Sequence, residues 1–168
     1  MRGICAAALC LLIPVLGAAQ TAPAKASLKN ATGDTIGEAV LTDTPHGVLM
    51  RVNLTQAPAG AHALHIHETG QCQPPFTTAG GHFNPARKQH GLQNPMGMHA
   101  GDLPNVEVPT SGALTVELLV PGVSLQSGPT SLFDTDGSAI VMHQTVDDYK
   151  SDPAGNAGAR VVCGVITR

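Results

Sequence analysis

The chain repeats one pattern that restricts its fold: short runs in which apolar side chains recur at every second position. In the clearest run, Val48, Met50, Val52 and Leu54 alternate with Leu49, Arg51 and Asn53. Successive side chains of a strand point to opposite faces, so this period is typical of a half-buried β-strand. No window of the sequence predicts a convincing amphipathic helix. We therefore expect an all-β protein.

Turn-forming residues separate the strand patterns and set their bounds. Gly33-Asp34, Thr44-Pro45 and residues 57–60 interrupt the first part of the chain. The expected strands are Lys25–Asn30, Ile36–Asp43, His46–Thr55, Ala61–Glu68, Leu103–Pro109, Ala113–Pro121, Ser138–His143 and Arg160–Thr167. Short strands in this number, with almost no helix, predict a sandwich or barrel in a single domain over residues 20–168.

Two long polar segments interrupt the strand pattern. Residues 69–101 are rich in Gly, Pro, Gln, Asn and His, and Thr145–Ala159 forms a second polar loop. A loop as long as the first is uncommon in a compact domain unless it is functional or disordered. Because it contains several groups that bind metals well, we expect an ordered functional loop held by Cys72 and by metal.

The first nineteen residues differ in character from the rest. Arg2 gives a positive start, Ile4–Leu16 is almost entirely apolar, and Gly17–Ala19 offers small residues. This pattern is typical of a secretory signal peptide, and the apolar run is short for a transmembrane helix. We expect residues 1–19 to be removed on export, to the periplasm or another compartment outside the cytoplasm. A later cleavage site and a retained anchor are the alternatives.

Charge and cysteine content constrain the chain that remains. Without residues 1–19, 8 Lys and Arg face 12 Asp and Glu, a formal net charge of −4. This acidic balance argues against non-specific binding to nucleic acid, and no basic amphipathic stretch predicts binding to a membrane. Cys72 and Cys163 remain, and an exported chain favours one disulfide over two free thiols. Such a bridge would close a loop of about 90 residues, adding roughly 4–5 kcal/mol in the chain-entropy model.

Histidines gather at expected strand ends and in the first long loop. In the strand over Ala61–Glu68, His65 and His67 project side by side, while Leu64 and Ile66 face a core. An isolated pair of this kind is as often a solvated polar face. Further donor candidates follow at His82, His90, His99, Asp102 and His143. Imidazoles suit copper and zinc, and a carboxylate beside three imidazoles suits zinc. Seven donors exceed one four-coordinate site, so a shared imidazole would serve two metals.

The order and spacing of these segments resemble the copper/zinc superoxide dismutases of the exported bacterial type. The matching segments are H-A-L-H-I-H-E at 62–68, G-G-H-F-N-P at 80–85, K-Q-H-G at 88–91, H-A-G-D-L-P-N at 99–105, A-I-V-M-H at 139–143, D-D-Y at 147–149 and N-A-G-A-R-V-V-C-G-V-I at 156–166. The resemblance covers Lys25 to Thr167. It implies an eight-stranded antiparallel Greek-key β-barrel, a sandwich-like architecture, with two long functional loops.

The resemblance also implies a role for each candidate residue. Copper would be bound by His65, His67, His82 and His143, and zinc by His82, His90, His99 and Asp102, so that His82 bridges the two metals. Asp147 would link a copper ligand and a zinc ligand through their outer ring nitrogens. Cys72 would pair with Cys163, and Arg160 would guide an anion toward copper.

The activity implied is dismutation of superoxide to dioxygen and hydrogen peroxide. Zinc has no redox chemistry, so the electron transfer belongs to copper, while His82 would take up and return a proton. Because the chain is net acidic, a local field from the metals and Arg160 must attract the substrate. A non-catalytic metal-binding protein and a zinc hydrolase are the alternatives, and the latter needs an open position on zinc. The sequence is compatible with both a monomer and a homodimer.

The remaining histidines and the loop methionines receive structural interpretations. His62 lies on the core-facing side of its strand, so we expect a structural, hydrogen-bonded histidine. His46 follows a proline in a turn and should be solvated. Met96 and Met98 flank the zinc-binding segment, and we expect them to pack against the protein and not to bind copper.

Overall fold

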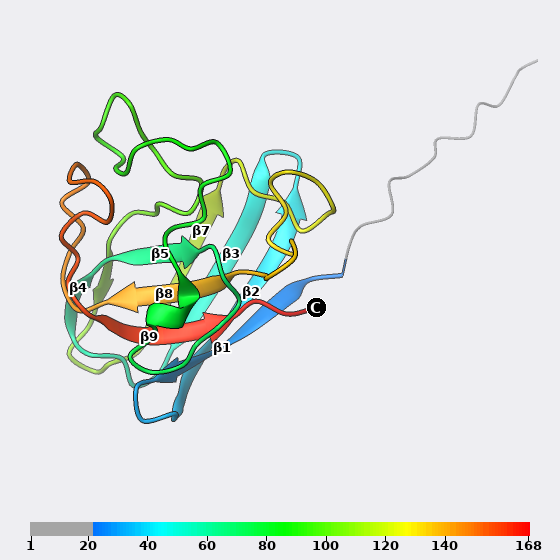
Figure 1. Ribbon diagram of the computed structural model, residues 1–168. Helices are drawn as coiled ribbons and strands as arrows, with labels where there is room; N and C mark the ends of the chain where they lie inside the picture. The colour runs from blue at the N-terminus through cyan, green and yellow to red at the C-terminus, as the bar shows by residue number, and fades with distance from the viewer. Residues whose placement is uncertain (1–21) are drawn as a thin grey trace, which may run out of the picture.

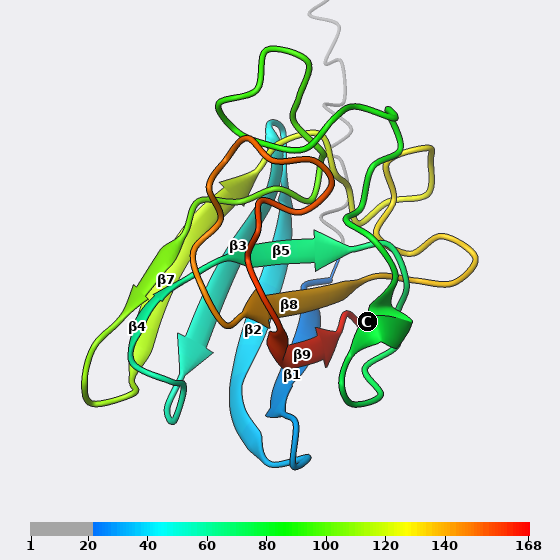
Figure 2. The same ribbon diagram turned by 60° about the vertical axis from the view of Figure 1, so that its left-hand side comes forward.

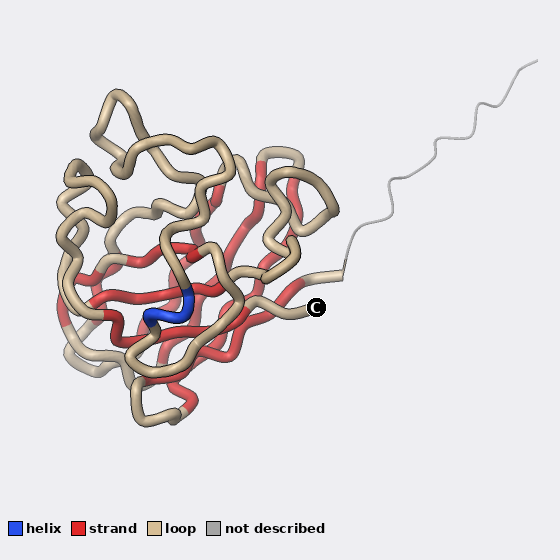
Figure 3. The backbone as a smooth tube through the Cα atoms, viewed as in Figure 1, coloured by secondary structure: helices blue, strands red, loops and turns tan. Residues whose placement is uncertain are grey.

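The computed structural model describes residues 22–168, which form β-strands and one short 3-10 helix (Figure 3). The all-β prediction is therefore confirmed. The predicted signal peptide lies outside the described residues. Within residues 22–168, no helix is long and apolar enough to cross a membrane.

The strands form one large antiparallel sheet and one small pair. They are β1 (Ala24–Asn30), β2 (Thr35–Thr44), β3 (Gly47–Leu54), β4 (Gly60–His62), β5 (Leu64–His67), β6 (Val106–Val108), β7 (Leu114–Val120), β8 (Ala139–His143) and β9 (Arg160–Val165), with the 3-10 helix η1 at Thr77–Ala79. The large sheet has the order β5-β8-β9-β1-β2-β3-β7, and β4 pairs with β6. The large sheet curls around the core, and the β4–β6 pair lies toward its open side, beside β7 (Figures 1 and 2). Crossovers between β5 and β8 and between β3 and β7 give the barrel its Greek-key order.

The single strand expected over Ala61–Glu68 is two strands in the structure, which is a correction. The chain changes partners at Ala63: β4 pairs with β6, whereas β5 pairs with β8. Ala63 N–H donates to the carbonyl of Thr145, and the carbonyl of Ala63 accepts from His143 N–H, both at 2.9 Å. The backbone of Ala63 is thus joined to the chain at the end of β8, directly before the histidine pair.

The alternation that predicted β3 matches the burial of its side chains. Val48, Met50 and Val52 are buried, and they belong to the main core cluster together with Leu64 and Ile66 of β5. The opposite face of β5, which carries His65 and His67, is buried as well. Since both faces of β5 are covered, the histidines lie between the barrel and the loops that pack on it.

A second, smaller core cluster lies between the first long loop and the outer face of β8 and β9. Phe76 and Ala79, at η1, pack with Ala139, Val141 and Cys163, and η1 crosses in front of these strands in Figure 3. The Cys72–Cys163 disulfide closes the same contact, so the predicted pairing is confirmed. Loop residues 72–80 are thereby tied to the last strand.

The two long loops meet at one end of the barrel, where the green and orange segments lie together in Figures 1 and 2. Gln93 N–H donates to the carbonyl of Tyr149 at 3.0 Å. Gly91, at φ +114°, allows this approach, because a Cβ at Gly91 would overlap the carbonyl oxygen of Tyr149. The loops therefore form one continuous cover over the histidine face of β5.

Candidate metal centre

The structure brings all seven predicted donors into one buried cluster. Strand β5 supplies His65 and His67, the end of β8 supplies His143, and the first long loop supplies His82, His90 and His99, with Asp102 directly after it. The donor atoms form two groups, each with its atoms within 4.8 Å of one another: His65, His67, His82 and His143, and His82, His90, His99 and Asp102. His82 belongs to both groups.

In the first group, two buried ring nitrogens have no hydrogen-bond partner among residues 22–168. His65 Nε2 lies 2.8 Å from Asp147 Oδ2, which leaves its Nδ1 without a partner. His82 Nδ1 lies 2.8 Å from Asp102 Oδ1, which leaves its Nε2 without one. Buried polar atoms are normally paired, so two unpaired nitrogens among four imidazoles fit a bound metal ion.

The other two rings of the first group, those of His67 and His143, each point one ring nitrogen at the other. His67 Nδ1 donates to the carbonyl of Gly80 at 3.0 Å, and His143 Nδ1 donates to that of Gly158 at 3.3 Å. With these tautomers, both Nε2 atoms carry lone pairs, yet they lie 3.4 Å apart. A cation between them removes this repulsion. Four imidazole donors of this kind suit copper.

The second group surrounds one carboxylate oxygen. Asp102 Oδ1 lies 2.8 Å from His82 Nδ1, 3.0 Å from His90 Nδ1 and 3.3 Å from His99 Nδ1. Asp102 Oδ2 is fixed separately, because it accepts from the backbone N–H groups of Gly91 and His99. Three imidazoles and one carboxylate match the donors and coordination number of a closed zinc site. His82 thus places Nδ1 beside Asp102 and leaves its Nε2 free of any hydrogen bond within residues 22–168.

Asp147 joins the two groups from outside. Its Oδ2 lies 2.8 Å from His65 Nε2, and its Oδ1 lies 3.0 Å from His90 Nε2. Its backbone is held by Asn105, whose side chain accepts from Asp147 N–H at 2.8 Å and donates to the Asp147 carbonyl at 2.9 Å. Sequence reasoning missed Asn105, although it closes the H-A-G-D-L-P-N segment and an asparagine can pair with both backbone groups of another residue.

Burial and neighbouring charges keep three imidazoles of the first group neutral. Burial, followed by repulsion from neighbouring imidazoles and Arg160, lowers the pKa of His67 to about 2 and that of His143 to about 3. Burial also lowers the pKa of His82 to about 4, although Asp102 opposes this change. At neutral pH these rings are unprotonated in the metal-free protein, so their lone pairs are free to bind a metal.

The carboxylates behave in the opposite way. Burial would raise the pKa of Asp102 and of Asp147, but hydrogen bonds from the surrounding histidines outweigh burial and lower both well below the usual range. Burial likewise disfavours protonation of His90, but Asp102 and Asp147 outweigh it and raise the pKa of His90 to about 9. Asp102 therefore supplies the second group with an ionised carboxylate, which suits a divalent cation, whereas His90 must lose its proton when it binds one.

Arg160 lies at the start of β9, where it pairs with His143 of β8. Its Nη1 donates to the carbonyl of Phe76 at 2.7 Å, and its Nη2 donates to that of Gly80 at 2.6 Å. Burial lowers its pKa, but a guanidinium stays charged in proteins. A fixed positive charge thus stands beside the first group.

The predictions for the other histidines and for the loop methionines have different outcomes. His62 is buried, with its ring nitrogens 2.9 Å from the carbonyl of His143 and 3.0 Å from that of Pro58, so its structural role is confirmed. His46 is exposed, as expected. The packing expected of Met96 is wrong: the residue is 65% exposed, in a turn where Asn94 accepts its backbone N–H.

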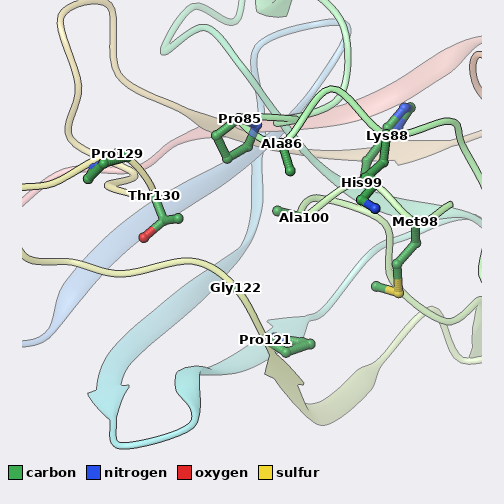
Figure 4. Close-up of a pocket in the computed structure, with 10 residues that line it drawn as sticks. All are labelled: Pro85, Ala86, Lys88, Met98, His99, Ala100, Pro121, Gly122, Pro129 and Thr130. Atoms are coloured by element: carbon green, nitrogen blue, oxygen red, sulfur yellow. The ribbon is translucent and has the colours of Figure 1, made fainter.

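Met98 lines an apolar surface pocket of about 450 Å³ between the first long loop and residues 121–130 (Figure 4). The pocket is formed by Pro85, Ala86, Lys88, Met98, His99, Ala100, Pro121, Gly122, Pro129 and Thr130. Apart from His99, it includes no member of the two donor groups. The pocket therefore borders the second donor group at His99 and otherwise lies outside the candidate metal centre.

The fold and site define a Greek-key β-barrel with two adjoining metal-donor groups. Residues 35–166 match the family model of copper/zinc superoxide dismutase (SODC). A copper/zinc superoxide dismutase of Aquifex aeolicus is 48% identical over 162 residues, covering 95% of this chain and 96% of that protein. One of Caulobacter vibrioides is 46% identical, covering 85% and 84%. The chain belongs to the copper/zinc superoxide dismutase family.

Solved structures agree with this assignment. The crystal structure of a double mutant of a SOD-like protein from Bacillus subtilis superposes with a TM-score of 0.82 at 41% identity, covering 86% of this chain and 97% of that one. The Cu/Zn superoxide dismutase from Brucella abortus gives a TM-score of 0.66 at 27% identity, covering 84% and 97%. The shared barrel extends over most of the described residues.

Proposed function

We propose that the protein is an exported superoxide dismutase that converts superoxide to dioxygen and hydrogen peroxide, with copper in the first donor group and zinc in the second. The observation that carries the proposal is the position of His82. His82 is a member of both donor groups, and its Nδ1 lies 2.8 Å from Asp102 Oδ1, which leaves Nε2 as the nitrogen available to the group of four imidazoles. Family membership and the names of the relatives support the same activity.

Bound copper would supply one-electron redox chemistry, and zinc, which has none, would supply a fixed positive charge. The protein holds the metal-binding side chains in position. Asp147 fixes the outer nitrogens of His65 and His90, and the carbonyls of Gly80 and Gly158 fix those of His67 and His143. Outer-sphere hydrogen bonds of this kind set the tautomer and orientation of metal-binding imidazoles.

Formation of hydrogen peroxide consumes two protons, and His82 is placed to hold one of them. Its Nε2 is buried and has no hydrogen-bond partner among the described residues. Its Nδ1 stays beside Asp102 at 2.8 Å, so the ring keeps its position when the charge at Nε2 changes. We assign Nε2 of His82 as the site of proton uptake and release.

Arg160 supplies the attraction for the substrate. Superoxide is an anion, and the chain without residues 1–19 has a net charge of −4, with 8 Lys and Arg against 12 Asp and Glu. Local charge must therefore outweigh net charge at the entrance to the site. The guanidinium of Arg160 is anchored by two carbonyls beside His67 and His143, which leaves it fixed in position and close to the first group.

The geometry favours this function over the two alternatives. A storage protein would need neither Arg160 nor a complete first group, and both are in place. A zinc hydrolase needs an open position for an activated water. The second group already offers four protein donors around one point, which leaves no such position on a tetrahedral zinc ion.

The test is to produce residues 20–168, load them with copper and zinc, and measure metal content, the paramagnetic signal of Cu(II) and superoxide decay. We expect about one copper and one zinc per chain and rapid decay that requires copper. A protein that binds zinc alone, or that binds both metals without accelerating superoxide decay, would contradict the proposal.

The proposal includes export. We infer that residues 1–19 are a signal peptide and that residues 20–168 act as one domain in the periplasm or a similar compartment, where the Cys72–Cys163 bridge can form. Mass spectrometry of the exported protein locates the cleavage site. Sedimentation at several concentrations separates the homodimer from the monomer.

A further inference from the structure

We propose that Asp152 is a positioning residue for the zinc site: its carboxylate fixes the backbone of His90 and thereby fastens the second long loop to the first. His90 N–H donates to Asp152 Oδ1 at 2.7 Å. This inference rests on the proposed function, in which His90 is a zinc ligand. It assigns a role to a residue outside both donor groups.

The second long loop holds His90 at both ends of the residue. Asp147 Oδ1 lies 3.0 Å from the outer ring nitrogen, Nε2, and Asp152 accepts the backbone N–H. Because Nδ1 of the same ring faces Asp102, its position depends on both anchors. The ring contact sets how the imidazole is turned, and the backbone contact sets how far it extends toward the second group.

Among the residues that join the two long loops, Asp152 can be changed without altering a metal donor or Asp147. The other cross-loop contact, between Gln93 N–H and the Tyr149 carbonyl, is formed by backbone atoms on both sides. At 2.7 Å, the bond from His90 N–H to the carboxylate of Asp152 lies at the short end of the usual N–H···O range, which is typical of bonds to a carboxylate. Its loss should free the backbone of His90 and leave the other donors in place.

The same loop contains a matched control in Asp148. Its carboxylate accepts from Lys150 N–H, Ser151 N–H and the side chain of Asn156, all within the loop, at 2.8–2.9 Å. Removing Asp148 or Asp152 changes the net charge equally. Of these two aspartates, Asp152 bonds to His90 and Asp148 does not, so a comparison of the two separates the cross-loop bond from general loosening of the loop.

The experiment compares wild type with Asp152→Ala, Asp152→Asn and Asp148→Ala, each loaded with copper and with zinc or Co(II) in the zinc site. Zinc release to a chromogenic chelator and the visible absorption bands of Co(II) are measured. Asp152→Ala should release zinc about 5–10-fold faster and shift the Co(II) bands, as expected for loss of one charge-assisted hydrogen bond. Asp152→Asn should stay within about twofold of wild type, because the amide oxygen still accepts.

Equal zinc release from Asp152→Ala and wild type would overturn the inference. So would an equal increase in Asp148→Ala, because the effect would then belong to the loop as a whole. Failure of wild type itself to bind zinc or Co(II) is a different result, which would overturn the proposed zinc site directly. The spectrum reports ligand geometry at the metal, which a change in overall stability does not alter.

Discussion

Arg160 and His67 share one acceptor, the carbonyl oxygen of Gly80, at 2.6 and 3.0 Å. The cation proposed to attract superoxide and a ring proposed to bind copper are therefore fixed to the same atom. Gly80 follows η1 in the loop that the disulfide ties to β9. Placement of the charge and placement of the ligand thus depend on one short segment.

Reversal of the charge at Arg160 should slow the enzyme without removing its metals. In Arg160→Glu no donor is touched, but an anion must approach against a negative charge, so we expect the rate constant to fall by more than tenfold at low salt. Higher ionic strength should then slow the variant less than wild type, or accelerate it, because it screens repulsion. Superoxide decay is measured against salt at matched copper occupancy.

Arg160→Lys is the control for shape, because it keeps the charge and loses the planar pair of donors that reaches Phe76 and Gly80. Its rate constant should lie between those of wild type and Arg160→Glu. Coincident salt curves for all three proteins would show that Arg160 has no guiding role.

Removal of His143 should affect the binding of copper much more than the binding of zinc. His143 belongs to the first donor group and not to the second, so His143→Ala should lose copper and activity while retaining most of its zinc. Metal analysis after dialysis, with superoxide decay on the same samples, checks this expectation. Full activity in the variant would exclude His143 from the copper site.

Gly155 should tolerate no side chain, because a Cβ there would overlap Asp147 Oδ1 and lie 2.7 Å from His90 Nε2. Gly155→Ala should displace Asp147 and weaken the retention of both metals by tenfold or more. Gly33→Ala is the control: Gly33, in the turn between β1 and β2, also has a positive φ, but its Cβ would meet no atom within 4 Å. Both variants carry backbone strain, so equal metal loss would contradict the role given to the overlap.

Stability of the metal-free protein should pass through a maximum near pH 6.5. The pKa values of His67, His82 and His143 are lowered to about 2, 4 and 3. Below pH 6.5 the unfolded chain therefore binds more protons, and stability falls as pH falls. His90, with its pKa raised to about 9, contributes stability below pH 6.5 that is lost as pH rises through 9.

Urea unfolding of the metal-free, disulfide-bonded protein from pH 4 to 10 measures this profile. The acid side should be the steeper one, because three histidines act there against one on the alkaline side. His90→Gln should flatten the alkaline side. A steady rise in stability from pH 6.5 to 9 in the parent protein would show that His90 is not held in its protonated form.

Much of the candidate metal centre could be predicted because its residues leave strong local signals. The period of two places His65 and His67 on one face of a strand, and ordered motifs identify the other donors. The donor groups also come from segments far apart in the sequence, and resemblance supplied their pairing where periodicity could not. The structure then showed the seven donors converging on two points.

Other features could not be predicted because they depend on which segments meet in space. The change of partner at Ala63 follows from backbone bonds to Thr145 and His143, which leave no trace in the local pattern. The bond from His90 to Asp152 joins residues 62 positions apart. An apolar side chain such as that of Met96 suggests burial, yet nothing local tells whether a loop turns it toward solvent.

The disulfide gives the chain a covalent topology that differs from a simple line. Cys72 and Cys163 close a ring of backbone that contains every proposed donor except His65 and His67. One peptide-bond break inside the ring, for example after the exposed Arg87 or Lys88, therefore opens the ring without separating the two halves of the molecule. A nicked protein would migrate as a single chain until it is reduced, with donors for the same metals on both sides of the cut.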